Sequence, residues 1–200
     1  MDEPTKPGRG KQLLFISAFI ALALIGVECS LRLYFVLAKD ISFFKPSEMA
    51  LSEYPELRHI RTAQGAARAR FNILILSSSV FVERFGHVPS LLEEKLRSRK
   101  ITDYAIYNAS DIAQTSRDSY IKYSALSDKH FDVVVLYEGM NETRANNCPP
   151  ELFKKDYSHY AWYETKNLIL KYRPIMDVSV IPYAIEYAYK SMKQSFLRDR

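Results

Sequence analysis

The sequence predicts an α/β fold: a flavodoxin-like parallel sheet with flanking helices, preceded by one N-terminal transmembrane helix. Two observations predict it, an uncharged apolar segment near the N-terminus and short apolar runs that recur with helical segments between them. Such alternation is typical of βαβ units, whose crossovers are right-handed and whose strands are parallel. We therefore divide the chain into an N-terminal segment 1–12, an anchor 13–38, a juxtamembrane connector 39–69 and an α/β domain 70–200.

The anchor begins after a short basic N-terminus, and residues 12–27 carry no charge. The hydrocarbon core of a bilayer is about 30 Å thick and needs about 20 helical residues, so the span must continue into the apolar residues that follow. Glu28 and Arg32 are four residues apart, which places them on one face of a helix, where they can pair. We expect a single membrane span over 13–38.

A cleaved signal peptide is the alternative, because it also has a basic start and an apolar centre. Cleavage needs an A-x-A-like pattern of small residues, and the sequence Gly26-Val27-Glu28-Cys29 supplies none. An uncleaved anchor is therefore favoured. The basic N-terminus predicts that residues 1–12 are cytoplasmic and that the domain lies on the extracytoplasmic, periplasmic side.

The connector 39–69 contains two prolines and a Gly-Ala-Ala stretch without sustained periodicity. Three short apolar runs after it predict buried parallel strands at 71–76, 104–109 and 132–137. The first of these strands should be central. Helices are expected between the strands, from Pro89 onward and from Thr115 or Ser116 to about residue 127. Further helices are expected at 151–156, 164–172 and 176–197, the last broken by Pro182.

The composition excludes several classes of function. Lys and Arg (28) exceed Asp and Glu (23) only modestly and are spread along the chain, which does not indicate nucleic-acid binding. The two cysteines, Cys29 and Cys148, form no CxxC pair, and the sequence has no histidine cluster with metal-ligand spacing. We therefore expect neither a metal nor a cofactor.

In a parallel sheet the carboxyl ends of the strands meet at one edge, so the loops after the three strands should converge. They carry SSSV at 77–80, NASDIAQTS at 108–116 and YEGMNE at 137–142. In this order and spacing, the three loops resemble the first three sequence blocks of the SGNH (GDSL-like) hydrolase family. The resemblance covers about residues 70–145 and implies a serine hydrolase.

The resemblance also implies roles for three residues. Ser79 would be the nucleophile, and the backbone N–H of Ala113 and the side-chain amide of Asn141 would stabilise the oxyanion. The chain departs from the family at Ser77-Ser78, where Gly-Asp or Gly-Gly is usual, and at Ala113, where glycine is usual. Alanine adopts a positive φ angle at greater cost than glycine does.

A fourth family block, Asp-x-x-His, normally supplies the acid–base pair near the C-terminal end of the domain. Asp156 and His159 match it literally, but they follow Asn141 closely. We expect either that this pair acts, or that the base is absent or supplied differently, or that the chain is a fragment of a longer protein. An exposed histidine without catalytic function is the alternative for His159.

Other interpretations of these loops stay open. Ser79 would otherwise be an ordinary loop serine that caps a turn. Asn108 and Asn141 both begin N-x-S/T sequons, which mark surface glycosylation in a eukaryotic secretory protein. The aromatic residues between 157 and 163 either line a carbohydrate or acyl site or pack against the domain.

The expected function is that of a membrane-tethered SGNH-type esterase or O-acyltransferase acting on ester-linked acyl groups, such as those of cell-envelope polysaccharide. The expected partners are the membrane and an acyl ester or glycan substrate. The alternative is a catalytically inactive SGNH-like module that binds glycan or takes part in assembly.

Overall fold

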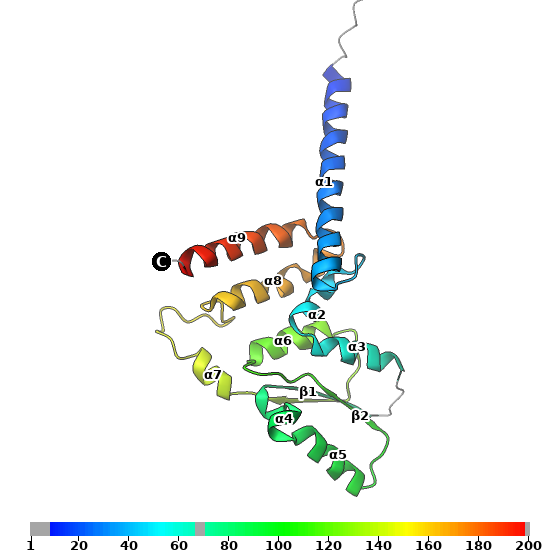
Figure 1. The fold of residues 1–200 in the computed structure, drawn as a ribbon, viewed down its shortest axis with the longest axis vertical. Helices are drawn as coiled ribbons and strands as arrows, with labels where there is room; N and C mark the ends of the chain where they lie inside the picture. Colours follow the sequence, from blue (N-terminus) through cyan, green and yellow to red (C-terminus); the bar gives the residue numbers. More distant parts are fainter. Residues whose placement is uncertain (1–8, 67–70, 199–200) are drawn as a thin grey trace, which may run out of the picture.

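The structure, a computed structural model, describes residues 9–66 and 71–198 (Figure 1). The predicted cytoplasmic end, up to residue 8, and the predicted domain start at residue 70 lie outside this range. The N-terminal part of helix α1 (Arg9–Lys39) stands away from the rest of the chain, and its C-terminal end, which includes the buried Arg32 and Phe35, packs on the domain (Figure 1). An 18-residue window of α1 has a mean hydropathy of 2.3, and none of that window is buried. Helix α1 is thus long and apolar enough to cross a membrane.

The sheet has three parallel strands in the order β2-β1-β3, as predicted. They are β1 (Phe71–Ser77), β2 (Tyr104–Asn108) and β3 (Val133–Tyr137). The central strand β1 pairs with both neighbours, so that Ile73 lies opposite Ile106 on one side and Val133 on the other. The α/β fold with a parallel sheet is confirmed, and its assignment to the flavodoxin-like class stays a prediction.

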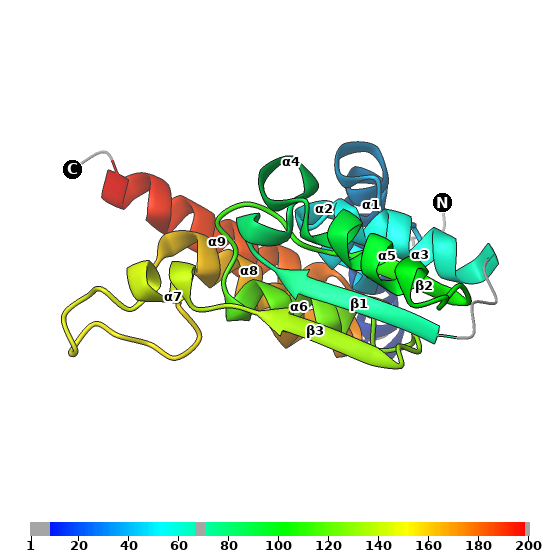
Figure 2. The same cartoon turned by 90° about the horizontal axis from the view of Figure 1, so that it is seen from below.

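Helices cover both faces of the sheet (Figures 1 and 2). Helix α6 (Ser116–Ala125) packs on β1 from one face, and α5 (Val88–Ser98) and the short α4 (Glu83–Gly86) lie on the other. Both long crossover helices lie where the sequence predicts them. Strands β1 and β3 differ in burial. Leu74 and Ile75 of β1 are fully buried, whereas most of β3 is exposed.

The structure differs from the prediction for the connector 39–69. This segment contains a 3₁₀ helix (Pro46–Met49), α2 (Ala50–Glu53) and α3 (Glu56–Ala66). Their apolar residues belong to the main hydrophobic core, where Met49, Tyr54, Leu57 and Ile60 are at most 1% exposed. The 3₁₀ helix and α2 have four residues each, which is too few to produce sustained periodicity, and the Gly-Ala-Ala stretch led to the interpretation of α3 as part of a connector.

The helices after β3 agree with the sequence in part. They are α7 (Met140–Ala145), α8 (Ala161–Met176) and α9 (Ile181–Arg198). The helix predicted at 151–156 is wrong, because the chain forms turns there. Pro182 does not break the last helix but lies in its first turn, where proline is tolerated because the N–H it lacks would have no helical partner.

Candidate functional site

The three loops meet at one edge of the sheet, as predicted. Ser79 begins the 3₁₀ turn Ser79–Phe81 directly after β1 and is partly exposed, whereas Ser78 is buried. The side chain of Asn108 at the end of β2 donates a hydrogen bond to the carbonyl oxygen of Phe81 over 2.8 Å. The Phe81 ring lies 5.5 Å from the ring of Tyr137 at the end of β3. The Ser79 loop thus contacts both neighbouring strand ends.

In the second loop, Ala113 has a φ of +57°, in the left-handed region. The backbone of Ala113 is therefore strained. The Nδ2 atom of Asn141 donates to the carbonyl oxygen of Gln114 over 2.6 Å. This bond places Asn141 beside the residue that follows Ala113.

Glu142 also joins the second and third loops. Its carboxylate accepts hydrogen bonds from the backbone N–H of Gly139, over 2.7 Å, and from the backbone N–H of Ser116. Gly139 has a φ of +127°, which L-residues with a side chain rarely adopt. The third loop can therefore turn back sharply enough for Glu142 to reach the start of α6.

Asp156 and His159 do not bond to each other in this structure. The Nε2 atom of His159 donates to the carbonyl oxygen of Ala145 over 2.9 Å, and Nδ1 accepts from the backbone N–H of Lys154 over 3.2 Å. Asp156 accepts from the N–H and hydroxyl of Ser158. Burial alone would raise the pKa of Asp156, but these bonds outweigh it and lower the pKa. The sequence-predicted pair thus ties together the turns that precede α8.

Behind the second loop lies a buried network of charges that the sequence analysis missed. Lys122 on α6 is completely buried, and its ammonium donates to the side chain of Gln114 and to the carbonyl oxygen of Ala109, and pairs with Glu56. Burial lowers the pKa of Lys122, and the carboxylate of Glu56 opposes that shift. This lysine therefore fixes the second loop from inside the domain.

Asp118 is the anionic centre of the same network. Its side chain, 1% exposed, accepts from the Tyr54 hydroxyl over 2.7 Å and from the Lys166 ammonium over 2.6 Å, and also from Tyr163. It completes the capping box of α6 with Thr115. Burial would raise the pKa of Asp118, but Lys166 and the hydrogen bonds outweigh it and lower the pKa.

Glu138 is a further titratable group at this edge that the sequence analysis did not single out. It directly follows β3, and its Oε1 atom accepts from the hydroxyl of Ser119. Its Oε2 atom is buried and has no hydrogen-bond partner among the described residues. Burial, with the nearby charges of Glu142 and Asp118, raises the pKa of Glu138 to about 7. Its position directly after a predicted strand could have indicated in the sequence that Glu138 lies at this edge.

A cleft of about 710 Å³ lies between α8 and α9, and His159, Trp162 and Tyr187 are among the residues that line it. The Trp162 ring stacks on Tyr160 at 4.7 Å, whereas Tyr163 is buried in packing. Of the aromatic residues between 157 and 163, Trp162 therefore lines the cleft and Tyr163 packs inside the domain. Ser79 does not line this cleft.

No protein-family model, curated protein or solved structure matches the chain. The candidate site is defined by its geometry and by the three loop sequences.

Proposed function

We propose that the protein is a membrane-anchored SGNH-type serine hydrolase, an esterase or O-acyltransferase that acts on ester-linked acyl groups. One observation carries the proposal: Ser79, Ala113 and Asn141 occupy consecutive loops at one sheet edge, and Asn141 bonds to the residue after Ala113. Helix α1 is the anchor. The basic N-terminus favours a domain on the periplasmic side, where O-acyl groups of envelope polysaccharide are the substrates.

The chemistry assigned to these residues is acyl transfer. The Ser79 oxygen attacks the acyl carbon, the ester alcohol leaves with a proton, and water or a sugar hydroxyl then takes the acyl group from Ser79. A side-chain amide has two N–H donors. Because Asn141 gives one to Gln114, the second remains for the oxyanion, next to the N–H of Ala113. The left-handed conformation of Ala113 supports this role of its N–H, because the family carries glycine there.

The test is ester hydrolysis by the full chain in detergent, with p-nitrophenyl acetate and an O-acetylated polysaccharide as substrates. Ser79→Ala should reduce hydrolysis to the background rate. Asn141→Ala should lower kcat by about 10²–10³, the usual effect of removing one oxyanion donor. The matched control is Ser98→Ala, an exposed serine on α5. Hydrolysis that survives in Ser79→Ala would exclude Ser79 as the nucleophile.

A second candidate function is favoured by the contacts of His159. Both ring nitrogens bond to backbone atoms, so no lone pair is free to accept the Ser79 proton. An SGNH-like module that binds glycan without catalysis would have this geometry. The variant His159→Ala separates the candidates: an enzyme that uses this histidine loses hydrolysis with little change in glycan binding. A binding module shows no hydrolysis in the unmodified chain and retains the glycan.

A further inference from the structure

The membrane-side end of the domain is attached to α1 by Glu28 and Arg32. The Glu28 carboxylate accepts from the Ser179 hydroxyl over 2.9 Å and from the Val180 N–H over 3.0 Å. The Arg32 guanidinium bonds to Glu28 over 2.6 Å and donates to the carbonyl oxygen of Asp177 over 2.9 Å. We call these contacts the clasp. They fix the turn before α9 at the height of residues 28–32 on α1.

The length of the apolar segment sets where this height lies in a membrane. The uncharged residues 12–27 span about 24 Å of helix. The hydrocarbon core is about 30 Å thick, so its second boundary falls about one helical turn beyond Val27. The clasp therefore lies at that boundary. The turn before α9 then lies at the level of the lipid headgroups.

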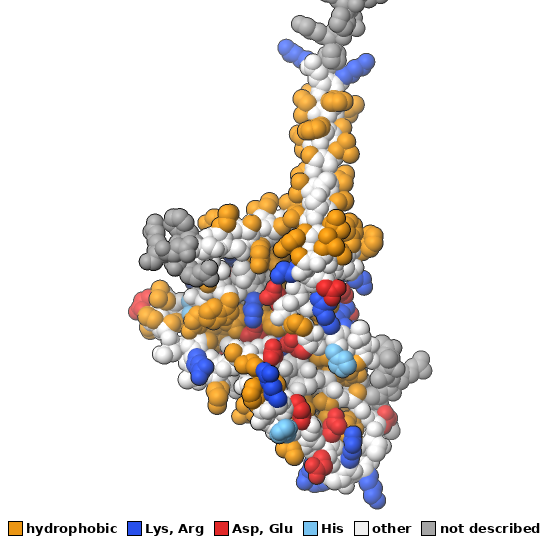
Figure 3. Space-filling model, viewed as in Figure 1, with side chains coloured by type: hydrophobic (Ala, Val, Ile, Leu, Met, Phe, Trp, Pro, Cys, Tyr) orange, Lys and Arg blue, Asp and Glu red, His pale blue; other side chains and the backbone are white. Residues whose placement is uncertain are grey.

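Helix α9 leaves this point sideways, across the direction of α1 (Figures 1 and 2). Its inner face packs on α8, where Glu186 bonds to the Tyr172 hydroxyl over 2.5 Å. Three apolar side chains at helical spacing on α9, and one in the turn before it, are each at least 63% exposed: Ile185, Tyr189 and Met192 on the helix, and Val178 in the turn. Figure 3 shows hydrophobic side chains along the edge of α9 that faces the same way as the free end of α1. The outer face of α9 is thus apolar and has no protein partner among the described residues.

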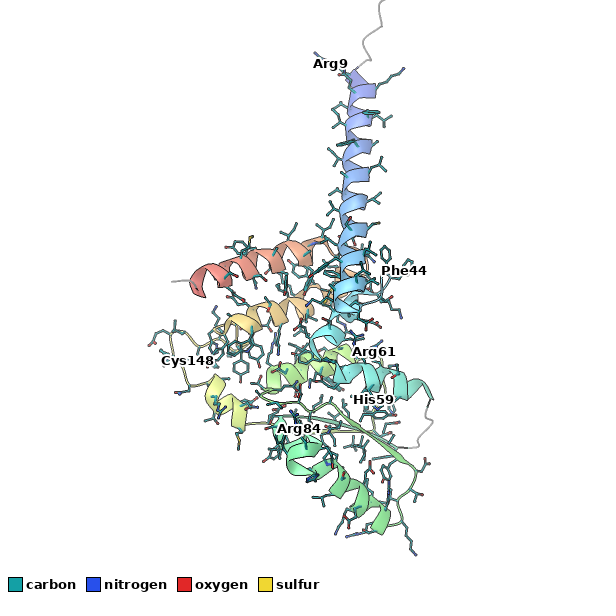
Figure 4. The ribbon with its side chains drawn as sticks, viewed as in Figure 1. Arg9, Phe44, His59, Arg61, Arg84 and Cys148 are labelled. Carbon is teal, nitrogen blue, oxygen red and sulfur yellow. The ribbon has the colours of Figure 1, made fainter. Side chains whose placement is uncertain are left out.

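A second apolar group lies at the same level. Phe44, 80% exposed, projects from the loop after α1 (Figure 4). Arg32 donates over 2.9 Å to the carbonyl oxygen of the preceding residue, Phe43, so the clasp also holds this loop. Exposed apolar side chains therefore occur on two sides of α1 at the height where the apolar span ends.

We propose that α9 is an interfacial helix, whose outer face and Phe44 insert into the headgroup and acyl boundary of the bilayer that α1 crosses. Amphipathic helices lie in the interface plane in this way, with the apolar face about 5–10 Å deep. The bilayer is the occupant because the clasp joins this face directly to the membrane span. The domain then rests on the membrane along α9, and the sheet lies on the side of α8 away from the lipid. The inference rests on the proposed anchoring by α1.

The test uses the full chain with Cys29→Ser and Cys148→Ser, reconstituted in vesicles of phosphatidylcholine and phosphatidylglycerol. A nitroxide label is placed on a new cysteine at Ile185 or Met192. The matched control is Leu91, an exposed apolar residue on α5 at the far end of the molecule. Collision with oxygen reports immersion in lipid, and collision with a water-soluble nickel complex reports exposure to water. The labels on α9 should collide with nickel several-fold less than the Leu91 label, because the apolar face of an interfacial helix is buried at the headgroup and acyl boundary.

A label at Phe19 in α1 separates failure of this inference from failure of the anchor. Immersion at Phe19 with water exposure at Ile185 and Met192 would overturn the interfacial helix alone. Water exposure at all three positions would overturn the anchor and the helix together. Labels on α9 that are shielded from both collision partners and broadened by a neighbouring label would mean that a second copy covers this face, which also overturns the inference.

Discussion

The two ends of the domain are held by different kinds of contact. At the end next to α1, the clasp joins α1 to the turn before α9 through two oppositely charged side chains whose other partners lie mainly in the backbone. At the sheet edge, the second and third loops are joined through Asn141 and Glu142. The Ser79 loop is held by the Ser77 hydroxyl, which donates to the carbonyl oxygen of Tyr137 over 2.7 Å, and by Asn108, which donates to Phe81. The Ser79 loop is thus held by neutral hydrogen bonds, whereas a carboxylate joins the other two loops, and hydrogen bonds to charged groups are worth more.

Breaking the clasp should have the largest effect. Arg32→Met should lower the free energy of unfolding by about 3–5 kcal/mol, because it removes the guanidinium bonds to the partly buried Glu28 and to two backbone carbonyl oxygens, and hydrogen bonds to charged groups are worth about 1.5–3 kcal/mol each. The measurement is urea unfolding in detergent, followed by the fluorescence of Trp162, the only tryptophan. Arg32→Lys, which keeps the charge but not the planar fork of donors, should lose less. Equal loss in both variants would show that the pairing with Glu28 contributes little.

Releasing the bond between the second and third loops should cost less. Glu142→Ala removes a carboxylate that accepts from two backbone N–H groups, and hydrogen bonds to charged groups are worth about 1.5–3 kcal/mol. Hydrogen exchange at the amides of Gly139 and Ser116 should accelerate in this variant. The control is Glu151→Ala, an exposed acid in the turns after α7. Unchanged exchange would mean that these loops are fixed by other contacts.

The Ser79 loop should respond less to the loss of one of its side-chain hydrogen bonds, the bond from Asn108. Asn108→Ala removes the bond to Phe81 and also a 3.1 Å bond from the Ser110 N–H. We expect a loss of about 1 kcal/mol and faster hydrogen exchange at Phe81 and Val82. The same variant removes one sequon while leaving the Asn141 sequon intact. A destabilisation larger than that of Glu142→Ala would reverse the ranking of the loops.

Most of the strands and helices in this comparison could be predicted from the sequence. Apolar runs predicted three parallel strands with β1 central, and Thr115 predicted the start of α6. The meeting of the three loops at one edge of the sheet followed from the parallel direction of the strands alone. The short helices before β1 were missed because Tyr54 and Leu57 become core residues only through contacts distant in the sequence.

The buried charges could not be predicted because each depends on partners from separate elements. Lys122 on α6 pairs with Glu56 from α3, and Asp118 on α6 pairs with Lys166 from α8. Sequence patterns place charged side chains at the surface, which is correct for most of them. His159 shows the opposite case, in which a sequence pattern suggests a pair that the structure does not form. Its spacing from Asp156 fits a catalytic pair, but Asp156 bonds to Ser158 and His159 bonds to Ala145.

The smallest effect should be a pH dependence at the sheet edge. The pKa of Glu138 is raised from 4.5 to about 7 in the folded protein. The native state therefore holds the proton more tightly than the unfolded chain, and stability should be full below pH 4.5 and decline as the pH rises through 7. Glu138→Gln should abolish this decline and make the protein more stable than the unmodified chain at pH 8. The difference should be on the order of 1 kcal/mol, because solvent screening reduces the effect for a half-exposed side chain.

Urea unfolding of both proteins at pH 5, 6, 7 and 8 measures this difference, and Glu151→Gln is the control for loss of an exposed acid. The stability curves of Glu138→Gln and the unmodified chain should meet near pH 5 and separate as the pH rises. Parallel curves would mean that Glu138 titrates normally, despite the buried and unpaired Oε2 atom. A separation that also appears in Glu151→Gln would assign the effect to net charge. A separation specific to Glu138 would place a carboxyl group that titrates near neutral pH at the edge that carries Ser79, next to loops that are already fixed by Glu142.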